Sequence, residues 1–183
     1  MAATEALVIA ARDGDEGAFE QLVELHRTET YRLCRMILGS SGEAQDAAQE
    51  AFVRAWRDLP KLRDTSRWAA WFRRATVRAA IDQSRRRRVR EITLDAAAAG
   101  GSLSAPDPTA GIAGRRDLAD AFARLDASDR AVLSLRYGAD LEVPDVAASL
   151  GIPLGTAKSR IHRALDRLRK QLGEDASKGE PLQ

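Results

Sequence analysis

A stretch without any lysine or arginine interrupts this otherwise highly charged chain and divides it in two. It covers residues 91–114, EITLDAAAAGGSLSAPDPTAGIAG, and holds five Gly and Pro residues between positions 100 and 111. Such a segment buries little apolar surface and interrupts any long helix, so it predicts a flexible linker. The chain of 183 residues is therefore expected to form one unit at 1–90, a linker, a second unit at 115–173 and a polar tail at 174–183.

Both units show helical periodicity, and neither shows sustained alternation of apolar and polar residues. In the first unit the pattern predicts one helix capped by Asp15 and ending at Gly39. Two more helices are expected from about residue 43 to 57 and from about residue 66 to 88. The expected fold class is all-α: two small helical domains joined by a flexible linker.

The second unit has the spacing of a helix-turn-helix. Asp126 can cap one helix, Pro144 suits the first turn of the next, and Gly151 suits a left-handed turn before a basic helix over 156–172. The polar residues of that last helix face largely away from its apolar stripe and are Thr156, Lys158, Ser159, His162, Arg163 and Asp166, with Arg160 and Arg167 at the edges. These side chains suit base edges and phosphates, although an ordinary solvated helix face has the same composition.

Positive charge is concentrated in two segments, although the formal net charge is only +2. Residues 73–90 carry +7 and residues 155–172 carry +5, which leaves −10 on the remainder. Two basic segments on an otherwise acidic chain predict two contacts with a polyanion. Trp68, Trp71 and Phe72 precede the first segment, and aromatic rings beside arginines suit unstacked bases. The alternatives are that the rings belong to the core and that the arginines form a solvated helix end.

The helix expected at 43–57 carries a polar, partly acidic ridge instead. Its members share helical spacing and are backed by two aromatic residues; the set is Asp46, Gln49, Glu50 and Arg54, with Phe52 and Trp56 behind. Acidic groups repel DNA phosphates, so this face indicates either a protein partner or plain solvent.

Several classes of protein are excluded by composition. The single cysteine, Cys34, rules out an internal disulfide framework and a multi-cysteine zinc site, and His26 and His162 have no ligand pattern around them. No metal, cofactor or catalytic site is expected, so the chain is not expected to be an enzyme. No apolar run approaches the ~18 residues of a membrane span, which predicts a cytoplasmic protein without direct membrane insertion.

Four stretches together resemble one family. They are GDEGAFEQLVELH, ILGSSGEAQDAAQEAFVRAWRDL, WAAWFRRATVRAAIDQSRRRR and LDASDRAVLSLRYGADLEVPDVAASLGIPLGTAKSRIHRALDRLRKQL, in that order. The chain resembles the extracytoplasmic-function (ECF) group of sigma-70-family sigma factors, the minimal two-domain bacterial transcription initiation factors. The resemblance covers about residues 5–172 and is most specific in the pattern DxxQExFxxAW and in the terminal GTxKSRxHRAxxRLR.

The resemblance implies a role for each candidate surface. It implies docking on the β′ clamp helices of core RNA polymerase through Asp46, Gln49, Glu50, Phe52 and Trp56. It implies recognition and melting of the promoter −10 element through Trp71, Arg74, Arg78, Asp82, Arg85 and Arg86. It implies reading of the −35 element by the six polar residues between Thr156 and Arg163. Further implied partners are the β flap of the polymerase and an anti-sigma factor, and the linker would thread through the active-site cleft toward the RNA exit path.

The sequence departs from the family pattern at three positions. Arg78 stands where Asn is usual, which leaves the favoured −10 base undetermined. Trp68 stands where Phe is more common, and Val143 stands where a capping Ser or Thr is usual.

Two other classes of protein remain as alternatives. A stand-alone helix-turn-helix regulator would need a dimer seam or an effector domain, and the sequence shows neither. A serine recombinase would need an α/β catalytic half, whereas Ser40 and Ser41 lie in a turn of an all-helical half.

Overall fold

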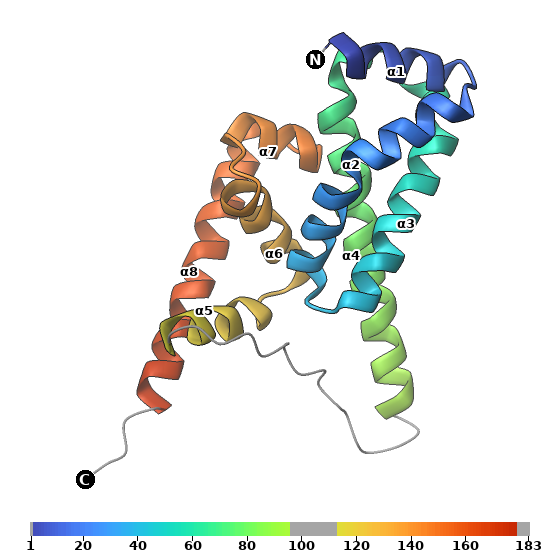
Figure 1. Cartoon of the computed structure of the whole chain (residues 1–183). Helices are drawn as coiled ribbons and strands as arrows, with labels where there is room; N and C mark the ends of the chain where they lie inside the picture. The colour runs from blue at the N-terminus through green and yellow to red at the C-terminus, as the bar shows by residue number, and fades with distance from the viewer. Residues whose placement is uncertain (1, 96–112, 179–183) are drawn as a thin grey trace.

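The computed structural model describes residues 2–95 and 113–178, and every regular element in these ranges is helical. The first unit comprises α1 (Ala2–Arg12), α2 (Glu16–Leu38), α3 (Ser41–Asp58) and α4 (Trp68–Asp95), with 3-10 turns at Leu59–Lys61 and Thr65–Arg67. The second unit comprises α5 (Ala113–Ala123), α6 (Ala127–Leu133), a π-helical turn at Ser134–Gly138, α7 (Val143–Leu150) and α8 (Leu154–Lys178). The predicted all-α class is confirmed (Figure 1).

The helix ends follow the local signals in the sequence. The Asp15 carboxylate accepts a hydrogen bond from the backbone N–H of Ala18 at 2.9 Å and so caps α2. Asp126 caps α6 in the same way. Gly39 and Gly151 end α2 and α7 with φ of 79° and 64°, a left-handed conformation that glycine adopts without steric cost. The predicted caps and stops at these four positions are confirmed.

Other boundaries differ from the sequence-based expectation. Helix α1 was not expected, and it forms because Val8 and Ala11 bury a short apolar face. Helix α4 continues to Asp95, inside the stretch expected to be linker. The chain has no Gly or Pro between the start of α4 and Gly100, and Arg87 pairs with Glu91 one turn further on. Residues 96–112 of the expected linker and 179–183 of the expected tail lie outside the described residues.

The first unit has a core of its own at the end where α1 crosses α2. Leu22 and Leu59 are almost completely buried there, together with the rings of Trp68 and Phe72, each 3% exposed. The two rings stack with their centroids 5.1 Å apart. This aromatic core fixes where α4 begins and therefore how its basic residues are presented.

A second core is shared between the two units. It joins Ile37 and Val77 of the first unit to Val132, Leu135 and Val146 of the second in one buried cluster. Helix α2 packs against α6, and α4 packs against α7, so the helix-turn-helix unit lies directly on the first unit (Figure 1). The structure thus shows a closed arrangement of the two helical units.

His26 occupies a half-buried position where a positive charge is unfavourable. Its Nε2 accepts a hydrogen bond from Trp68 Nε1 at 3.2 Å, and its ring packs against Phe72. Burial lowers the pKa of His26 below the ordinary 6.5; nearby Glu29 opposes this effect and Arg73 reinforces it. Protonation would also place a donor opposite the Trp68 donor, so the structure requires a neutral His26.

We expect the free energy of unfolding to decrease as the pH falls below about 6.5, the pKa of an unfolded histidine. The unfolded chain binds the His26 proton more readily than the folded chain does. The stabilisation that neutral His26 provides is therefore complete above the pKa of the unfolded histidine, and it is lost as the pH falls through the pKa of His26 in the folded protein. When urea denaturation is measured at pH 7 and at pH 5, the decrease in the free energy of unfolding between the two pH values should be smaller in His26→Gln than in the wild type. His162→Gln, at a side chain 75% exposed, is the control and should leave the pH dependence unchanged.

Candidate nucleic-acid interface and docking groove

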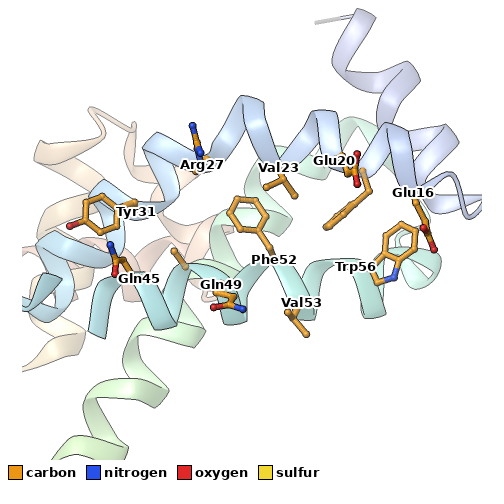
Figure 2. Close-up of a pocket in the computed structure, with 12 residues that line it drawn as sticks. Glu16, Glu20, Val23, Arg27, Tyr31, Gln45, Gln49, Phe52, Val53 and Trp56 are labelled. Carbon is orange, nitrogen blue, oxygen red and sulfur yellow. The ribbon is translucent and has the colours of Figure 1, made fainter. Parts of the chain in front are cut away.

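An open apolar groove of about 690 Å³ runs between α2 and α3. Figure 2 shows Val23 of α2 facing Phe52 of α3, with Trp56 farther along α3 near Glu16; Val53 also lines the groove. The Trp56 ring lies 4.9 Å, centroid to centroid, from that of Phe19. Charged and polar side chains surround this apolar floor: Glu16, Glu20, Arg27, Gln45 and Gln49. An apolar floor with a polar rim suits the apolar face of an amphipathic helix from a partner protein.

The five residues predicted to dock on polymerase fall into two groups. Gln49, Phe52 and Trp56 line the groove. Asp46 is exposed on the adjacent face of α3, and it makes no salt bridge to any residue in the described ranges. Glu50 instead accepts a hydrogen bond from Arg54 at 2.7 Å, so its charge is already partly neutralised. The groove and its acidic neighbour form a continuous surface along α3.

A polar pocket of about 490 Å³ lies on the other side of α3, against α4. Three of the residues predicted to contact the −10 element, Trp71, Arg74 and Arg78, line it together. Arg54 and Arg57 of α3 also line it, and each is paired with a carboxylate of the same helix, Glu50 at 2.7 Å and Asp58 at 3.3 Å. An aromatic ring among four guanidinium groups can stack an unstacked base while the cations contact phosphates. Sequence reasoning missed Arg57, because only the packing of α3 on α4 brings it to this pocket.

The remaining predicted −10 residues lie in different surroundings. Asp82 is partly buried and accepts a hydrogen bond from Arg54 at 2.7 Å, which raises the pKa of Arg54 and holds its guanidinium beside the pocket. Arg85 and Arg86 are exposed farther along α4. Arg87 pairs with Glu43 at 2.9 Å and so joins α4 to α3. The arginine run therefore combines a structural cation with exposed ones.

The sequence allowed two roles for the three aromatic residues near the basic segment, packing in the core or stacking on unstacked bases, and the structure separates them. Trp68 and Phe72 belong to the core. Trp71 is half-buried and faces the polar pocket, so base stacking remains the prediction for this ring alone.

Helix α8 presents one polar face away from the rest of the protein. Ala157, Ile161 and Ala164 are buried on its inner side. The predicted −35 residues Lys158, Ser159, Arg160, His162 and Arg163 are all exposed, and Thr156 is half-buried at the start of this face. Arg163 Nε donates to the carbonyl of Ser159 at 3.2 Å, and His162 lies 3.4 Å from Asp166. Hydrogen-bond donor side chains of different lengths thus lie on one exposed face of a helix, an arrangement that suits contacts with base edges in the major groove.

Replacing Lys158 or Arg163 with alanine is expected to weaken binding to promoter duplex. A bidentate contact to a base should cost about 1–3 kcal/mol and relax specificity at one position. A phosphate contact should weaken binding to all sequences equally and reduce the salt slope by about one. Measuring the binding of each protein variant to duplexes of altered sequence, at two salt concentrations, separates these cases. If both protein variants bind promoter duplex as the wild type does, this face of α8 does not recognise the −35 element.

Other kinds of site are absent from the described parts of the chain. Within residues 2–95 and 113–178 no group of His, Cys, Asp and Glu is arranged to hold a metal ion. No helix in these same ranges is both long and apolar enough to cross a membrane. Burial raises the pKa of the Cys34 thiol to about 12, which keeps it unreactive near neutral pH.

Two family models match this chain on the units that carry these surfaces. The model of sigma-70 region 2 matches residues 22–90, which include the polar pocket and all of the groove except Glu16, Phe19 and Glu20. The model of sigma-70 region 4 matches residues 121–170, which include the exposed face of α8.

Known proteins of similar sequence and structure agree with these matches. The chain is 30% identical over 173 residues to the ECF RNA polymerase sigma factor SigW of Bacillus subtilis, covering 88% of this chain and 92% of SigW. It is 32% identical over 171 residues to the ECF RNA polymerase sigma factor SigL of Mycobacterium tuberculosis, covering 92% of this chain and 97% of SigL.

Two solved structures share the fold. CnrH, in complex with the cytosolic domain of CnrY, matches with a TM-score of 0.67 and 26% identity over 94% of this chain and 99% of CnrH. The sigma factor RpoE of Bartonella quintana, in complex with the anti-sigma factor NepR, matches with a TM-score of 0.64 and 24% identity over 85% of this chain and 96% of RpoE. With both units matched by family models and nearly the full length matched by relatives, the chain belongs to the ECF group of sigma-70-family RNA polymerase sigma factors.

Proposed function

We propose that this protein binds core RNA polymerase and directs it to promoters by reading the −35 element with α8 and the −10 element with α4. The observation that carries the proposal is the presence of two separate basic surfaces, one in each unit. The α8 face is exposed and built for duplex readout, whereas the Trp71 pocket combines a ring with guanidinium groups and suits single-stranded DNA. A factor that both locates and opens a promoter needs both kinds of contact.

The polymerase-facing surface in this proposal is the α2–α3 groove with its acidic neighbour Asp46. The apolar floor would accept the β′ clamp helices, and Asp46 would meet basic residues on them. The second unit would contact the β flap. The roles follow the predicted division of the chain, with residues 1–90 for polymerase docking and the −10 element and residues 115–173 for the −35 element. The role is one of binding, without catalysis by this chain, and its place of action would be the cytoplasm.

An anti-sigma factor is the further partner that we propose. CnrH, a relative in structure, was solved with the cytosolic domain of a second protein, CnrY. In this chain the groove between α2 and α3 offers an open apolar surface that an inhibitor could occupy in place of the polymerase.

Run-off transcription with and without core polymerase tests the proposal. The chain with core enzyme should start transcripts at defined sites, and neither component should do so alone. Tight promoter-specific binding by the chain alone, with no effect on added core enzyme, would indicate a stand-alone helix-turn-helix regulator instead. DNA cleavage and rejoining by the chain alone would indicate a recombinase.

A further inference from the structure

One basic side chain of α8 reaches across to the start of α6. Arg167 donates a hydrogen bond from its Nη1 to Oδ2 of Asp129, and the same Nη1 lies 3.7 Å from Oδ2 of Asp126. In the sequence Arg167 lies at the edge of the basic face of α8, where it could equally contact DNA phosphates. The structure instead places its guanidinium on two carboxylates of the neighbouring helix.

The two carboxylates belong to the N-terminal cap of α6. Oδ1 of Asp126 accepts a hydrogen bond from the backbone N–H of Asp129 at 2.8 Å. The side chain of Asp129 itself is only 11% exposed. A buried carboxylate is unfavourable unless a cation or a hydrogen-bond donor meets it, and Arg167 meets this one. The ion pair is therefore tied to the fixed start of α6 and not to a mobile surface group.

The apolar contacts of α8 leave its orientation weakly constrained. The buried residues on its inner side are Ala157, Ile161 and Ala164, and two of these three side chains end at Cβ. Leu165 and Leu168 are only partly buried. Apolar packing has no preferred direction, whereas a hydrogen-bonded ion pair fixes both a distance and an angle. We therefore attribute the angle at which α8 lies on α6 largely to the ion pair of Arg167 with Asp129.

This angle affects the far end of α8, where the predicted −35 residues lie. Arg167 follows Arg163 by four residues and Thr156 by eleven, which corresponds to about 6 Å and about 16 Å along the helix axis. A tilt of roughly 5° about the Arg167 end would move Thr156 by about 1.4 Å at that separation. Binding groups have to be held within about 0.5 Å of their productive positions. Loss of the ion pair would thus misplace these residues without altering any of them.

We propose that Asp129 and Arg167 are positioning residues for −35 recognition, whose ion pair sets where the six predicted −35 residues of α8 meet the major groove. The inference rests on the proposed function for the role of α8, whereas the ion pair itself does not. Neither residue needs to touch DNA. Removing the negative charge of Asp129 should strengthen DNA binding if only the overall field matters. A positioning role predicts the opposite for sequence discrimination, which should decrease.

The test compares two DNA duplexes bound by holoenzyme that is assembled from core RNA polymerase and the full-length chain. One is a promoter duplex that the wild-type holoenzyme selects from a randomised pool, and the other is the same duplex with a scrambled −35 block. The protein variants are Asp129→Asn, Arg167→Gln and the double variant. The readout is the ratio of the two dissociation constants. Unfolded or unassembled protein weakens both affinities by the same factor, so a loss of stability alone leaves this ratio unchanged.

We expect each single variant to lower the ratio about tenfold, the size of the loss when one bidentate contact to a base is misplaced. The double variant should lower it no further than either single variant does, because both substitutions break the same pair. The salt dependence of binding should not change. The matched control is Asp140→Asn, which makes the same change of charge at a fully exposed side chain in the turn before α7 and should keep the wild-type ratio.

Three outcomes would overturn the positioning role and leave the proposed function intact. The first is a wild-type ratio in Asp129→Asn. The second is equal weakening of both duplexes in Arg167→Gln with a salt slope lower by about one, which would make Arg167 a phosphate contact. The third is a loss in the double variant equal to the sum of the two single losses. If the wild-type holoenzyme binds both duplexes equally, α8 does not read the −35 element, and that assignment and the positioning role are overturned together.

Discussion

Replacing Arg130 with alanine is expected to lower the free energy of unfolding by about 3 kcal/mol, because two buried carbonyls and one part-buried carbonyl lose their donor. Arg130 is only 6% exposed. Its NH1 donates to the carbonyls of Ala123 at 2.8 Å and Leu125 at 2.7 Å, and its Nε donates to Ile37. Burial lowers the pKa of Arg130, and the carbonyl partners offset part of that desolvation.

Arg130 owes this effect to its position at the ends of two helices. Ala123 is the last residue of α5, and Ile37 lies in the last turn of α2, where carbonyls have no donor within the helix. A cation there also interacts favourably with both helix dipoles. The side chain thus caps one helix in each unit.

Urea denaturation followed by circular dichroism measures the loss. Arg169→Ala is the matched control, because Arg169 is 69% exposed and its one salt bridge within the described residues is to Asp166. Exposed pairs of this kind contribute about 0–1 kcal/mol. A loss in Arg130→Ala no larger than that of the control would show that water replaces the guanidinium at all three carbonyls.

Local signals in the sequence were enough to place most helix ends and the helix-turn-helix. Asp15, Gly39, Asp126 and Gly151 act through backbone geometry within one turn, and such effects are legible without knowledge of the fold. The end of α4 at Asp95 could not be predicted in this way. The salt bridge of Arg87 with Glu91 and the absence of a helix-breaking residue extend α4 into a stretch whose composition is typical of a linker.

The contacts that create the candidate sites depend on packing between distant segments, so the sequence indicated their residue types but not their arrangement. The spacing of Trp68 and Trp71 allowed either a core or a stacking role for both, and only the packing of α4 on α1–α3 separates them. Asp82 is still predicted to contact DNA, but its hydrogen bond from Arg54, which lies on a different helix, could not be predicted from the sequence. The contact of Gly151 with Arg74 joins residues 77 positions apart and has no counterpart in any local pattern.

Charge reversal at Asp46 is expected to weaken the binding of this chain to core RNA polymerase by about 10–100-fold, which corresponds to roughly 1.4–2.7 kcal/mol. Asp46 is exposed on α3 beside the groove and makes no salt bridge within the described ranges, so Asp46→Lys should leave the fold intact. The new lysine would oppose the basic partner surface that an acidic ridge indicates.

The measurement is the affinity of a fluorescently labelled chain for core enzyme, alongside urea denaturation of the same variant. Asp13→Lys makes the same change of charge at a carboxylate 66% exposed in the loop after α1, outside both α3 and the lining of the groove, and should bind like the wild type. Since both variants alter the net charge equally, a loss confined to Asp46→Lys must come from local contact rather than from the overall field. If Asp46→Lys binds core enzyme with full affinity and unfolds like the wild type, the acidic ridge of α3 is not part of the docking surface. The apolar groove between α2 and α3 would then bind the polymerase without a contribution from Asp46.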